Sequence, residues 1–391
     1  MANDTHQAAV SVRSLRLLQV GTFTSQFDRL TIAPMLVVIA AEMGRSVESV
    51  SHAAAVYFLC YGIAQVGWGV VSDRLGRVRT MRLALLLAMV GGLASALVPD
   101  VGWLIAARGL TGACFAAAIP GALVYVGDTV PVEVRQAPLT DLMTSSAVGM
   151  AMATMTAGAI ADFTSWRVAF ALTGVIAGVL SLVMRGMVEP RLGQPPAVWS
   201  SLRGVLTNRP ALLVLGLVLV EGVVLLGPLT FLPVVLHASG LSVPLAGLLT
   251  AAYGVAVLVF ARVVKARTRT MAPARLIAVG GGLSVLAYFL LVLTHGAAVV
   301  VVATVLLGGG WAFMHSTMQT WATDMAPGYR ATAISLFATV LFTGSAVGAA
   351  AFGPMVDAGS FTVMFAITLA LSVPLVVIAV VGRRRYAIRG S

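Results

Sequence analysis

Long apolar runs separated by short polar segments make up most of the chain between residues 17 and 382. A helix needs about 20 apolar residues to cross a bilayer, and these runs lack the alternation of apolar and polar residues that marks a membrane β-strand. We therefore expect about twelve transmembrane helices and an all-α membrane protein. The predicted spans cover residues 17–40, 51–72, 81–98, 102–126, 139–161, 167–187, 210–236, 243–264, 273–294, 297–321, 331–355 and 361–382.

The second half of this pattern repeats the first. Five residues recur in type 195 positions later: Arg135 with Arg330, Gly149 with Gly344, Gly158 with Gly353, Asp162 with Asp357, and Phe170 with Phe365. A repeat of half the chain length in so apolar a sequence is typical of transporters, in which two similar bundles face each other across a shared cavity. We therefore predict two pseudo-symmetric bundles of about six helices each.

The same pattern divides the chain into five segments. Residues 1–16 form a polar N-terminal tail, 17–187 a first bundle, 188–209 a linker, 210–382 a second bundle and 383–391 a basic C-terminal tail. The linker is assigned because its residues are polar, include several prolines and lie at mid-chain.

Charge adds an orientation. Hydrophobic residues account for 59% of the chain and charged residues for 10%, against about 25% in soluble domains. The net charge is +11, and the chain has 25 Lys and Arg residues. If both termini lie on the same side of the membrane, only Arg45 and Arg167 fall on the opposite side. Arg29 and Arg108 lie within predicted spans. This bias predicts that both termini are cytoplasmic, and it makes lipid headgroups rather than nucleic acid the expected partners of these charges. The excess of arginine over lysine is typical of a GC-rich bacterial genome, so we expect a bacterial inner-membrane protein.

Motifs for enzyme chemistry are missing from the sequence. Cys60 and Cys114 lie in different predicted spans, with no Cys-x-x-Cys pair and no His-Cys cluster, so neither a disulfide nor a metal site is expected. There is no HExxH, GxSxG or phosphate-binding GxxxxGK[ST] sequence. We expect no enzyme and no bound cofactor, and a proton gradient in place of ATP as the energy source.

The loop after the second predicted span carries the sequence Gly69-Val-Val-Ser-Asp73-Arg74-Leu-Gly76-Arg77. Gly76 permits a tight reversal of the chain, and Asp73 at a helix end could cap another helix or pair with an arginine. The loop resembles the signature loop of the major facilitator superfamily, Gly-x3-Asp-Arg-x-Gly-Arg, and the resemblance extends over the whole chain. The alternative is a basic loop that only orients the protein.

This resemblance implies a secondary transporter that works by alternating access and functions as a monomer. It also implies that the loop latches the two halves together in the outward-facing state, with Arg77 paired to Asp128. In the second half the matching loop keeps basic residues around Arg262 and Arg267, but Lys265 stands where the aspartate should be. We therefore expect a latch in the first half only.

Charged residues inside the predicted spans are the main candidates for function. Asp28 and Arg29 lie near the middle of the first span, and Glu221 lies near the middle of the seventh. A charge at that depth costs about 2.5–3.5 kcal/mol on the mildest scale, so such residues normally face a polar cavity. Asp28 and Glu221 are 193 positions apart, close to the repeat offset, so we interpret them as equivalent carboxylates that could carry protons.

Arg108 occurs in the sequence Ala-Arg-Gly-Leu-Thr-Gly, which resembles the family's fourth helix and implies that Arg108 is a partner of Asp28. The alternative for Asp28, Arg29 and Arg108 is a static ion-pair cluster that braces the first bundle. Glu221 has no basic residue within the spans of its own half, which favours a role in proton or substrate binding over a purely structural one.

Polar and adaptable side chains share helical faces elsewhere. The tenth span carries three such residues on one helical face, spaced by four positions: Trp311, His315 and Gln319. They could line the cavity as hydrogen-bonding residues, with His315 as a titratable group. The alternative is that they make ordinary contacts with neighbouring helices. Four further residues are weaker candidates for lining the cavity: Tyr57, Tyr61 and Gln65 in the second span and Met150 in the fifth. Each of them could equally pack against neighbouring helices.

Two directions of transport stay open. The arrangement Asp28-x5-Pro34 resembles the start of drug:proton antiporters, which implies proton-coupled efflux of small amphipathic compounds. The antiporter motif Gly-x3-Gly-Pro-x2-Gly-Gly of the fifth helix is only partly present, because Ala153-Thr154 replaces Gly-Pro. The alternative is a proton-coupled importer of a small anionic metabolite, in which Arg29 and Arg108 clamp a carboxylate. A non-transporting receptor of the same fold is a further alternative.

Overall fold

The computed structural model describes residues 11–190 and 198–389, and all regular elements in these ranges are helical. The first bundle contains α1 (Val12–Thr31), η1 (Ala33–Met35), α2 (Leu36–Met43), α3 (Val47–Leu75), α4 (Arg77–Leu97), α5 (Val101–Phe115), α6 (Ala118–Thr129), α7 (Gln136–Phe163), α8 (Trp166–Val183) and η2 (Met184–Gly186). The second contains α10 (Arg209–Glu221), η3 (Gly222–Leu226), α11 (Gly227–Leu229), α12 (Leu232–Ala238), α13 (Val243–Thr250), α14 (Ala252–Arg267), α15 (Pro273–Leu293), α16 (Ala297–Gly310), η4 (Trp311–His315), α17 (Ser316–Met325), η5 (Pro327–Tyr329), α18 (Arg330–Asp357) and α19 (Phe361–Arg389). The predicted all-α fold is confirmed.

Each predicted span falls on helix, and among the described residues ten helices are long and apolar enough to cross a membrane. The predicted spans 17–40 and 139–161 are not among the ten. The first carries Asp28 and Arg29 and is interrupted by η1, and the second is rich in serine and threonine. The number of crossings therefore stays a prediction.

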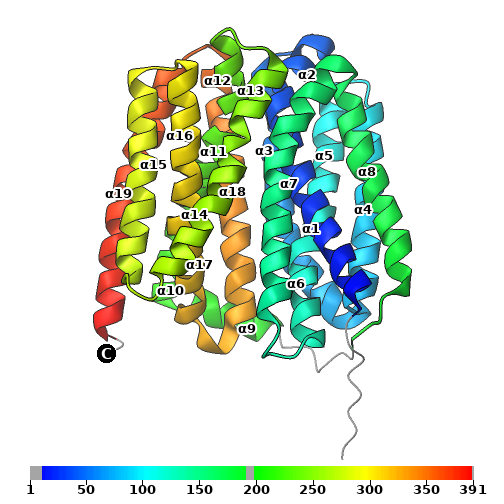
Figure 1. Cartoon of the computed structure of the whole chain (residues 1–391), viewed down its shortest axis with the longest axis vertical. Coiled ribbons are helices and arrows are strands. Elements are labelled where there is room, and N and C mark those ends of the chain that lie inside the picture. The colour runs from blue at the N-terminus through cyan, green and yellow to red at the C-terminus, as the bar shows by residue number, and fades with distance from the viewer. Residues whose placement is uncertain (1–10, 191–197, 390–391) are drawn as a thin grey trace, which may run out of the picture.

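The two bundles stand side by side (Figure 1). We call the end that carries the first residues of α1, α4, α10 and α18 the terminal face, because both described chain ends lie there. We call the opposite end, where α2, α12 and α13 lie, the distal face (Figure 1). The charge bias of the sequence makes the terminal face the expected cytoplasmic one.

The internal repeat is visible in the helix boundaries. α13, α15 and α16 begin 196 residues after α3, α4 and α5, and α19 begins 195 residues after α8. The offset of 195 that the sequence predicts therefore holds to within one residue through most of the chain.

Two equivalent glycines set the register between the first helix of each half and its neighbour. A Cβ at Gly149 of α7 would lie 2.5 Å from the carbonyl oxygen of Phe23 in α1, and a Cβ at Gly344 of α18 would overlap the carbonyl oxygen of Leu219 in α10. Phe23 and Leu219 are 196 apart, so Glu221 corresponds to Ser25 rather than to Asp28. The equivalence expected for Asp28 and Glu221 is wrong by three residues, nearly one helical turn.

Glycines also bring the halves into contact at the distal face. A Cβ at Gly158 in α7 would lie 2.9 Å from the carbonyl oxygen of Val243 in α13, and one at Gly353 in α18 would lie 2.8 Å from Ser51 Oγ in α3. Small residues allow this approach between helices in lipid, where close packing provides the attraction. The distal ends of the two halves are thus closed against each other.

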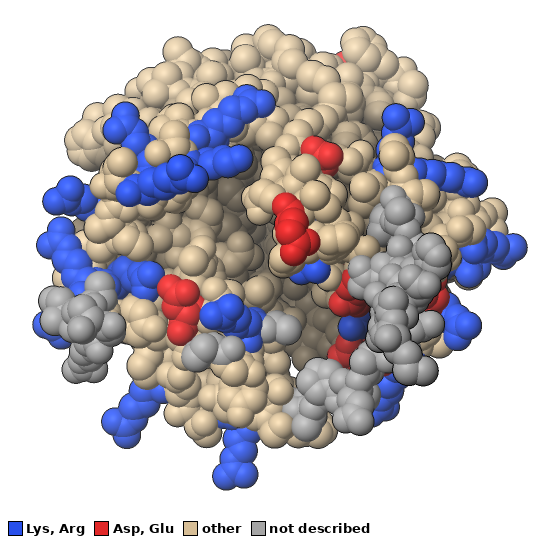
Figure 2. Space-filling model, turned by 60° about the horizontal axis from the view of Figure 1, so that its bottom comes forward, with Lys and Arg blue, Asp and Glu red and all other residues tan. Residues whose placement is uncertain are grey.

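The terminal face is open by comparison. A Cβ at Gly69, near the end of α3, would meet no described atom within 4 Å. Figure 2 shows the molecule hollowed at this end, with charged side chains around the hollow. The cavity between the halves therefore opens toward the terminal face.

The predicted linker and tail contain helix. Residues 191–197 of the linker lie outside the described ranges, but α9 (Val198–Leu206) follows them, with Val205 buried and Trp199 84% exposed. A Cβ at Gly204 of α9 would overlap the ring of Tyr329, so α9 belongs to the second half. The basic tail expected from residue 383 continues α19 as helix to Arg389, and its first residue, Arg383, bonds Asp324 Oδ2 at 3.0 Å.

Candidate functional site

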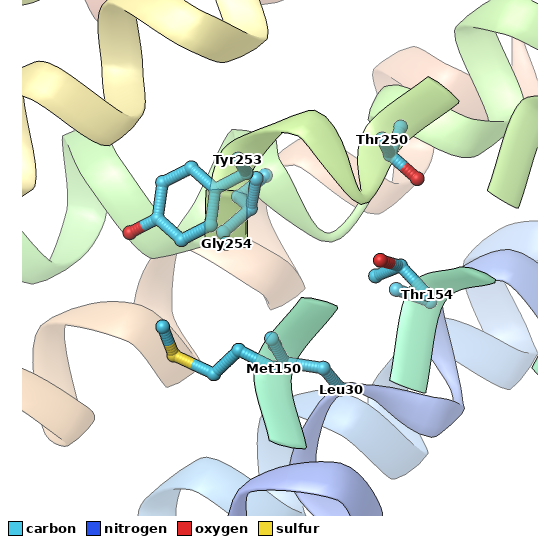
Figure 3. A pocket seen from close by; sticks show the side chains of 8 residues that line it. Leu30, Met150, Thr154, Thr250, Tyr253 and Gly254 are labelled. Atoms are coloured by element: carbon cyan, nitrogen blue, oxygen red, sulfur yellow. The ribbon is translucent and has the colours of Figure 1, made fainter. Parts of the chain in front are cut away.

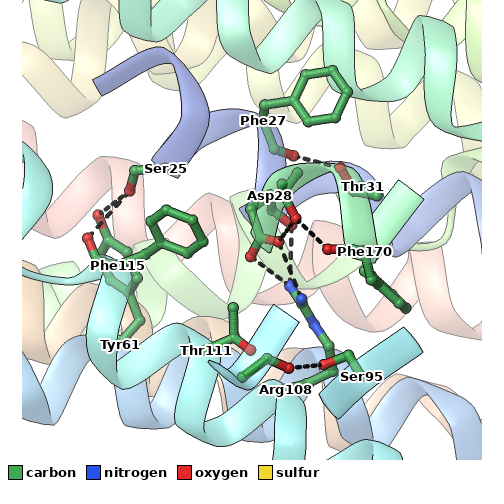
Figure 4. Close-up of polar contacts among 12 residues, drawn as sticks. Ser25, Phe27, Asp28, Thr31, Tyr61, Ser95, Arg108, Thr111, Phe115 and Phe170 are labelled. Atoms are coloured by element: carbon green, nitrogen blue, oxygen red, sulfur yellow. Dashed lines mark hydrogen bonds and ion pairs between the residues drawn. The ribbon is translucent and has the colours of Figure 1, made fainter. Parts of the chain in front are cut away.

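Asp28 and Arg108 form a closed ion pair inside the first half (Figure 4). Arg108 Nη2 donates to Asp28 Oδ2 at 2.7 Å, Nη1 donates to Oδ1 at 3.1 Å, and Thr173 Oγ1 in α8 donates to Oδ1 at 2.7 Å. The guanidinium lies over the rings of Tyr57 and Phe170, at 4.7 and 4.4 Å from their centroids. Both charged side chains are 0% exposed. The pair therefore ties α1 to α5 and α8 without facing the cavity, as in the static alternative.

Arg29, the next residue along α1, lies at the boundary between the halves. It is 4% exposed, and its Nη2 donates to Met150 Sδ of α7 at 3.7 Å. Its guanidinium carbon lies 5.0 Å from the ring centroid of Phe342 in α18 and 5.8 Å from that of Tyr61 in α3. No carboxylate of the described residues pairs with Arg29, and its Nε has no hydrogen-bond partner. Because a buried charge needs a counter-charge, this position can hold an anion.

The second half buries a looser pair. His315 Nδ1 lies 3.4 Å from Glu221 Oε2, and within the described chain Glu221 Oε1 has no partner. The His315 ring stacks on Trp311 with centroids 3.7 Å apart. Glu221 directly precedes the π-helical segment η3, and His315 ends the π-helical segment η4. Such π segments are rare and often occur at functional sites. This pair is therefore held less tightly than the pair of Asp28 and Arg108.

The other predicted residues divide between these clusters. Tyr61 and Met150 surround Arg29, Tyr57 packs under Arg108, and Trp311 supports His315. Gln319 is exposed one turn beyond His315, and Gln65 is buried in α3. Neither glutamine contacts the charged groups through a hydrogen bond in the described chain.

Sequence reasoning missed three residues of the site. Thr173 and Phe342 are of ordinary type for their helices, so nothing in the sequence distinguishes them. Tyr253 of α14 is buried, and its hydroxyl has no partner among the described residues. Its position 196 residues after Tyr57 was a usable signal.

The signature loop forms a compact ion-pair network. Arg77 Nη1 lies 2.5 Å from Asp73 Oδ1, and Arg77 Nε lies 3.0 Å from Asp128 Oδ2, so the expected pair of Arg77 and Asp128 is present. Arg74 is exposed. In the second half Arg262, Lys265 and Arg267 are exposed, and the described chain gives them no ion pair. Whether the loop acts as a latch stays a prediction.

Glu189 anchors this loop, which the sequence did not indicate. Its carboxylate caps the N-terminus of α4 by accepting from the backbone of Val78 at 3.0 Å and of Arg79 at 3.1 Å. A Cβ at Gly76 would lie 2.6 Å from Glu189 Cδ, and Gly76 has a φ of 107°. Gly76 is thus required both by its backbone conformation and by the space that Glu189 occupies.

A small cavity of about 10 Å³ lies between the halves (Figure 3). Its walls are Leu30, Ala33, Met150, Thr154, Leu229, Thr250, Tyr253 and Gly254. This volume suits about one water molecule. The described residues contain no group of three or more His, Cys, Asp or Glu side chains able to hold a metal ion.

The sequence model of the family described as Major Facilitator Superfamily matches residues 18–349. The chain belongs to this superfamily. Among solved structures, a bacterial homologue of the human lysosomal transporter Spinster aligns with a TM-score of 0.77 and 16% identity over 98% of each chain. A D-xylose–proton symporter aligns with a TM-score of 0.78 and 15% identity, over 93% of this chain and 96% of that one. These likenesses establish the fold, and the family makes the chain a secondary transporter and not an enzyme.

Curated relatives point in two directions. The hexuronate transporter of Escherichia coli K12 is 28% identical over 169 residues, which cover 43% of this chain and 39% of that protein. The multidrug resistance efflux pump PmrA of Streptococcus pneumoniae is 29% identical over 168 residues, 41% of each chain. The efflux pump DotC of Dothistroma septosporum is 28% identical over 166 residues, which cover 42% of this chain and 28% of that protein. The matched segments span less than half of each relative.

Proposed function

We propose that this transporter couples the uptake of a small organic anion to protons, with Arg29 as the anion site and Glu221 with His315 as the proton site. The observation that carries the proposal is the buried Arg29 guanidinium, which lacks a carboxylate partner among the described residues. A ligand carboxylate would supply the missing counter-charge through charge-assisted hydrogen bonds.

Arg108 is not part of this site. Asp28 already takes both of its Nη groups, so an anion clamp built from Arg29 and Arg108 together would first have to break a buried ion pair. Arg29 alone is available, and it is framed by side chains from both halves. A ligand bound there would touch the two bodies whose relative motion opens one face and closes the other.

The driving force is sufficient for such uptake. A potential of 100 mV is worth about 2.3 kcal/mol per charge, and about 1.4 kcal/mol is a tenfold equilibrium ratio. One proton carried with a monovalent anion moves no net charge, so the pH difference alone drives that cycle, about tenfold per pH unit. A second proton in each cycle would move one net charge and add a factor of roughly fortyfold at 100 mV.

Efflux of amphipathic compounds is the second candidate function. The aromatic surroundings of the site favour it, because Tyr61, Phe342 and Trp311 offer faces to an apolar or cationic ligand. Two of the relatives above are named efflux pumps.

Transport by purified protein in liposomes with an imposed pH gradient separates the two candidates. The probes are D-glucuronate as the anion and ethidium as the amphipathic cation. We expect D-glucuronate accumulation, a loss of at least about tenfold in Arg29→Ala, and partial activity in Arg29→Lys, since a missing charged partner costs about 1.5–3 kcal/mol. Arg45→Ala, at an exposed distal arginine, is the matched control. Proton release driven by ethidium and unchanged in Arg29→Ala would instead favour efflux.

A further inference from the structure

A second cavity, of about 260 Å³, lies at the distal face of the first half, where α3 and α5 begin. Its polar walls are Arg45, Ser49, His52 and Asp100. Arg45 and His52 make no hydrogen bond or ion pair with described residues. Asp100 Oδ1 caps α5 by accepting from the backbone nitrogen of Trp103 at 3.1 Å, and Asp100 Oδ2 has no partner in the described chain. The cavity therefore presents a guanidinium, an imidazole and a carboxylate oxygen that no described residue pairs with.

The cavity opens on the lipid-facing side of the first half. His52 shares one face of α3 with Leu59 and Ile63, which lie roughly two and three turns further along the helix. Ile63 is 58% exposed, and on α5 Trp103 and Leu110 are 64% and 42% exposed. Exposed apolar side chains on a membrane-spanning helix contact acyl chains, and tryptophan is enriched where these chains meet the headgroups. The cavity thus lies at headgroup depth, next to an apolar surface formed by α3 and α5.

The equivalent positions of the second half carry no charge. The register of 196 that relates α3 to α13 and α5 to α16 pairs Asp100 with Gly296. The other three polar wall residues correspond to leucines, which are Leu241, Leu245 and Leu248. Leu245 and Leu248 are exposed. An apolar surface therefore satisfies the fold at this place, so the charges of the first half point to a ligand.

We propose that this cavity binds the headgroup of a phospholipid that carries both a phosphate and a primary ammonium group, as phosphatidylethanolamine does. The phosphate accepts from the Arg45 guanidinium and from the His52 ring, and the ammonium group donates to Asp100 Oδ2. The acyl chains lie along the apolar surface of α3 and α5. A cavity needs about 10–15 Å³ to hold one water molecule, so 260 Å³ accommodates a group of many atoms.

The charges of the cavity select this class of lipid. Phosphatidylglycerol offers the same phosphate but no cation for Asp100, whose carboxylate then lies beside an unbalanced negative charge. Phosphatidylcholine has a cation, but its quaternary nitrogen carries no N–H group that could donate to a carboxylate. Charge complementarity therefore favours phosphatidylethanolamine over both of these lipids.

This site is independent of the proposed function. It lies on the outer side of the first half, whereas Arg29 lies between the halves. Loss of the lipid leaves the anion site intact, so Arg45→Ala stays a control for transport.

Lipid binding to the purified full-length protein tests the proposal. Protein stripped of lipid in detergent is titrated with phosphatidylethanolamine, phosphatidylglycerol or phosphatidylcholine, and native mass spectrometry gives the Kd of each bound lipid. Arg45→Ala removes the contact to the phosphate. Asp100→Asn removes the charge that faces the ammonium group and keeps the cap of α5, because asparagine caps helices as well as aspartate does. The matched controls at the distal face are Arg167→Ala, at an arginine that pairs with Glu42, and Asp162→Asn, at an exposed aspartate.

We expect the wild type to bind phosphatidylethanolamine at least about tenfold more tightly than the other two lipids, the effect of one charge-assisted hydrogen bond. Arg45→Ala should weaken the binding of phosphatidylethanolamine about tenfold or more. Asp100→Asn should lose the preference for phosphatidylethanolamine and should bind phosphatidylglycerol at least as tightly as the wild type does, which also shows that the variant is folded. Both controls should stay within about twofold of the wild type.

Three results would overturn the proposal. Equal or reversed wild-type affinities for the three lipids would show that the cavity does not recognise the ammonium group. Unchanged binding of phosphatidylethanolamine in both variants would place the lipid elsewhere on the protein. Glycerophosphoethanolamine has the same headgroup without acyl chains, and displacement of the lipid by an equal concentration of it would make the cavity a site for a soluble phosphate.

Discussion

The two halves each bury a carboxylate on their first helix, and they bond it in different ways. In the first half Asp28 accepts from both Nη groups of Arg108 and from Thr173, and every partner lies in the same bundle. In the second half Glu221 has one long contact with His315 and an oxygen without a partner in the described chain. The first carboxylate has a full set of partners, whereas the second has an oxygen left without one among the described residues. We expect the first to hold its bundle together and the second to change state.

Arg29 lies in the first half of the sequence, but its side chain contacts residues of both halves. Consecutive residues on a helix point about 100° apart, so Asp28 and Arg29 face different surroundings although they are neighbours in the chain. Asp28 turns into its own bundle, and Arg29 turns toward Met150 and Phe342. Adjacent charges in one span can therefore serve different purposes.

The largest expected effect is on stability. Arg108→Leu leaves Asp28 buried without a counter-charge and should lower the free energy of unfolding by about 3–5 kcal/mol, while the double variant Asp28→Leu with Arg108→Leu should recover most of that loss. Unfolding of the purified proteins in mixed detergent measures both. If Asp28→Asn kept wild-type stability and lost only proton coupling, Asp28 would be the proton carrier and the contrast between the halves would be wrong.

Glu221→Gln should have the converse effect. Its single contact is long and glutamine has nearly the same shape, so we expect the free energy of unfolding to change by about 1 kcal/mol or less. Proton-driven accumulation of D-glucuronate should fall at least about tenfold, because the proposed proton site is gone. Comparison with Asp28→Asn in the same two assays is the control. Unchanged accumulation in Glu221→Gln would move the proton site elsewhere.

A smaller effect is expected at the distal contact between the halves. Asp357 Oδ1 accepts from the backbone nitrogen of Val47, the first residue of α3, at 2.9 Å, whereas its repeat partner Asp162 is exposed and makes no hydrogen bond to described residues. Asp357→Asn should therefore favour distal opening by about 0.3–1 kcal/mol, the value of a charge at a helix N-terminus.

Asp162→Asn is the matched control for this prediction and should have no effect. Distances between spin labels at Arg45 and Gly296, in distal loops of the two halves, report the population of the opened state. Equal shifts in both variants would show that the contact with α3 is not the cause.

The smallest expected effect is on the pH dependence of stability, and it arises from a residue in the second half. Burial lowers the pKa of His295, in the loop between α15 and α16, below its ordinary 6.5, although a hydrogen bond to the Leu291 backbone opposes this. The folded state therefore favours the neutral His295 ring. The contribution of this ring to the free energy of unfolding is complete above pH 6.5 and is lost as the pH falls through the lower pKa of the folded state. The equivalent loop of the first half, residues 98–100, has no histidine. Melting temperatures at acidic and neutral pH should differ less in His295→Gln than in the wild type.

Most of the fold could be predicted from the sequence because apolar runs and their length specify membrane helices. The predicted span 273–294 differs from α15 by one residue. The end of the last helix could not be found in this way, since α19 continues past residue 382 on contacts of Arg383 with Asp324 and with the Trp321 ring. The start of α1 at Val12 depends on the Ser11 cap, a signal weaker than hydropathy.

The candidate site was predictable to the extent that its residues are unusual. A charge in an apolar run is conspicuous, and Asp28, Arg29, Arg108 and Glu221 were found for that reason. Which of them pair was harder to predict, because it depends on helix rotation and on a register of 196 rather than 195 near Phe23 and Leu219. Uncharged partners such as Thr173 and Phe342 carry no such mark and needed the three-dimensional arrangement.

The anchors on either side of the mid-chain segment also concern how the molecule could be made. Glu189 fastens the end of the first half to α4, and Gly204 of α9 packs on Tyr329 in the second half. Each half therefore holds its own end of the connection. Two separately translated fragments, cut between residues 193 and 194, should associate in the membrane into a functional pair. Such a split pair would let each half be labelled alone.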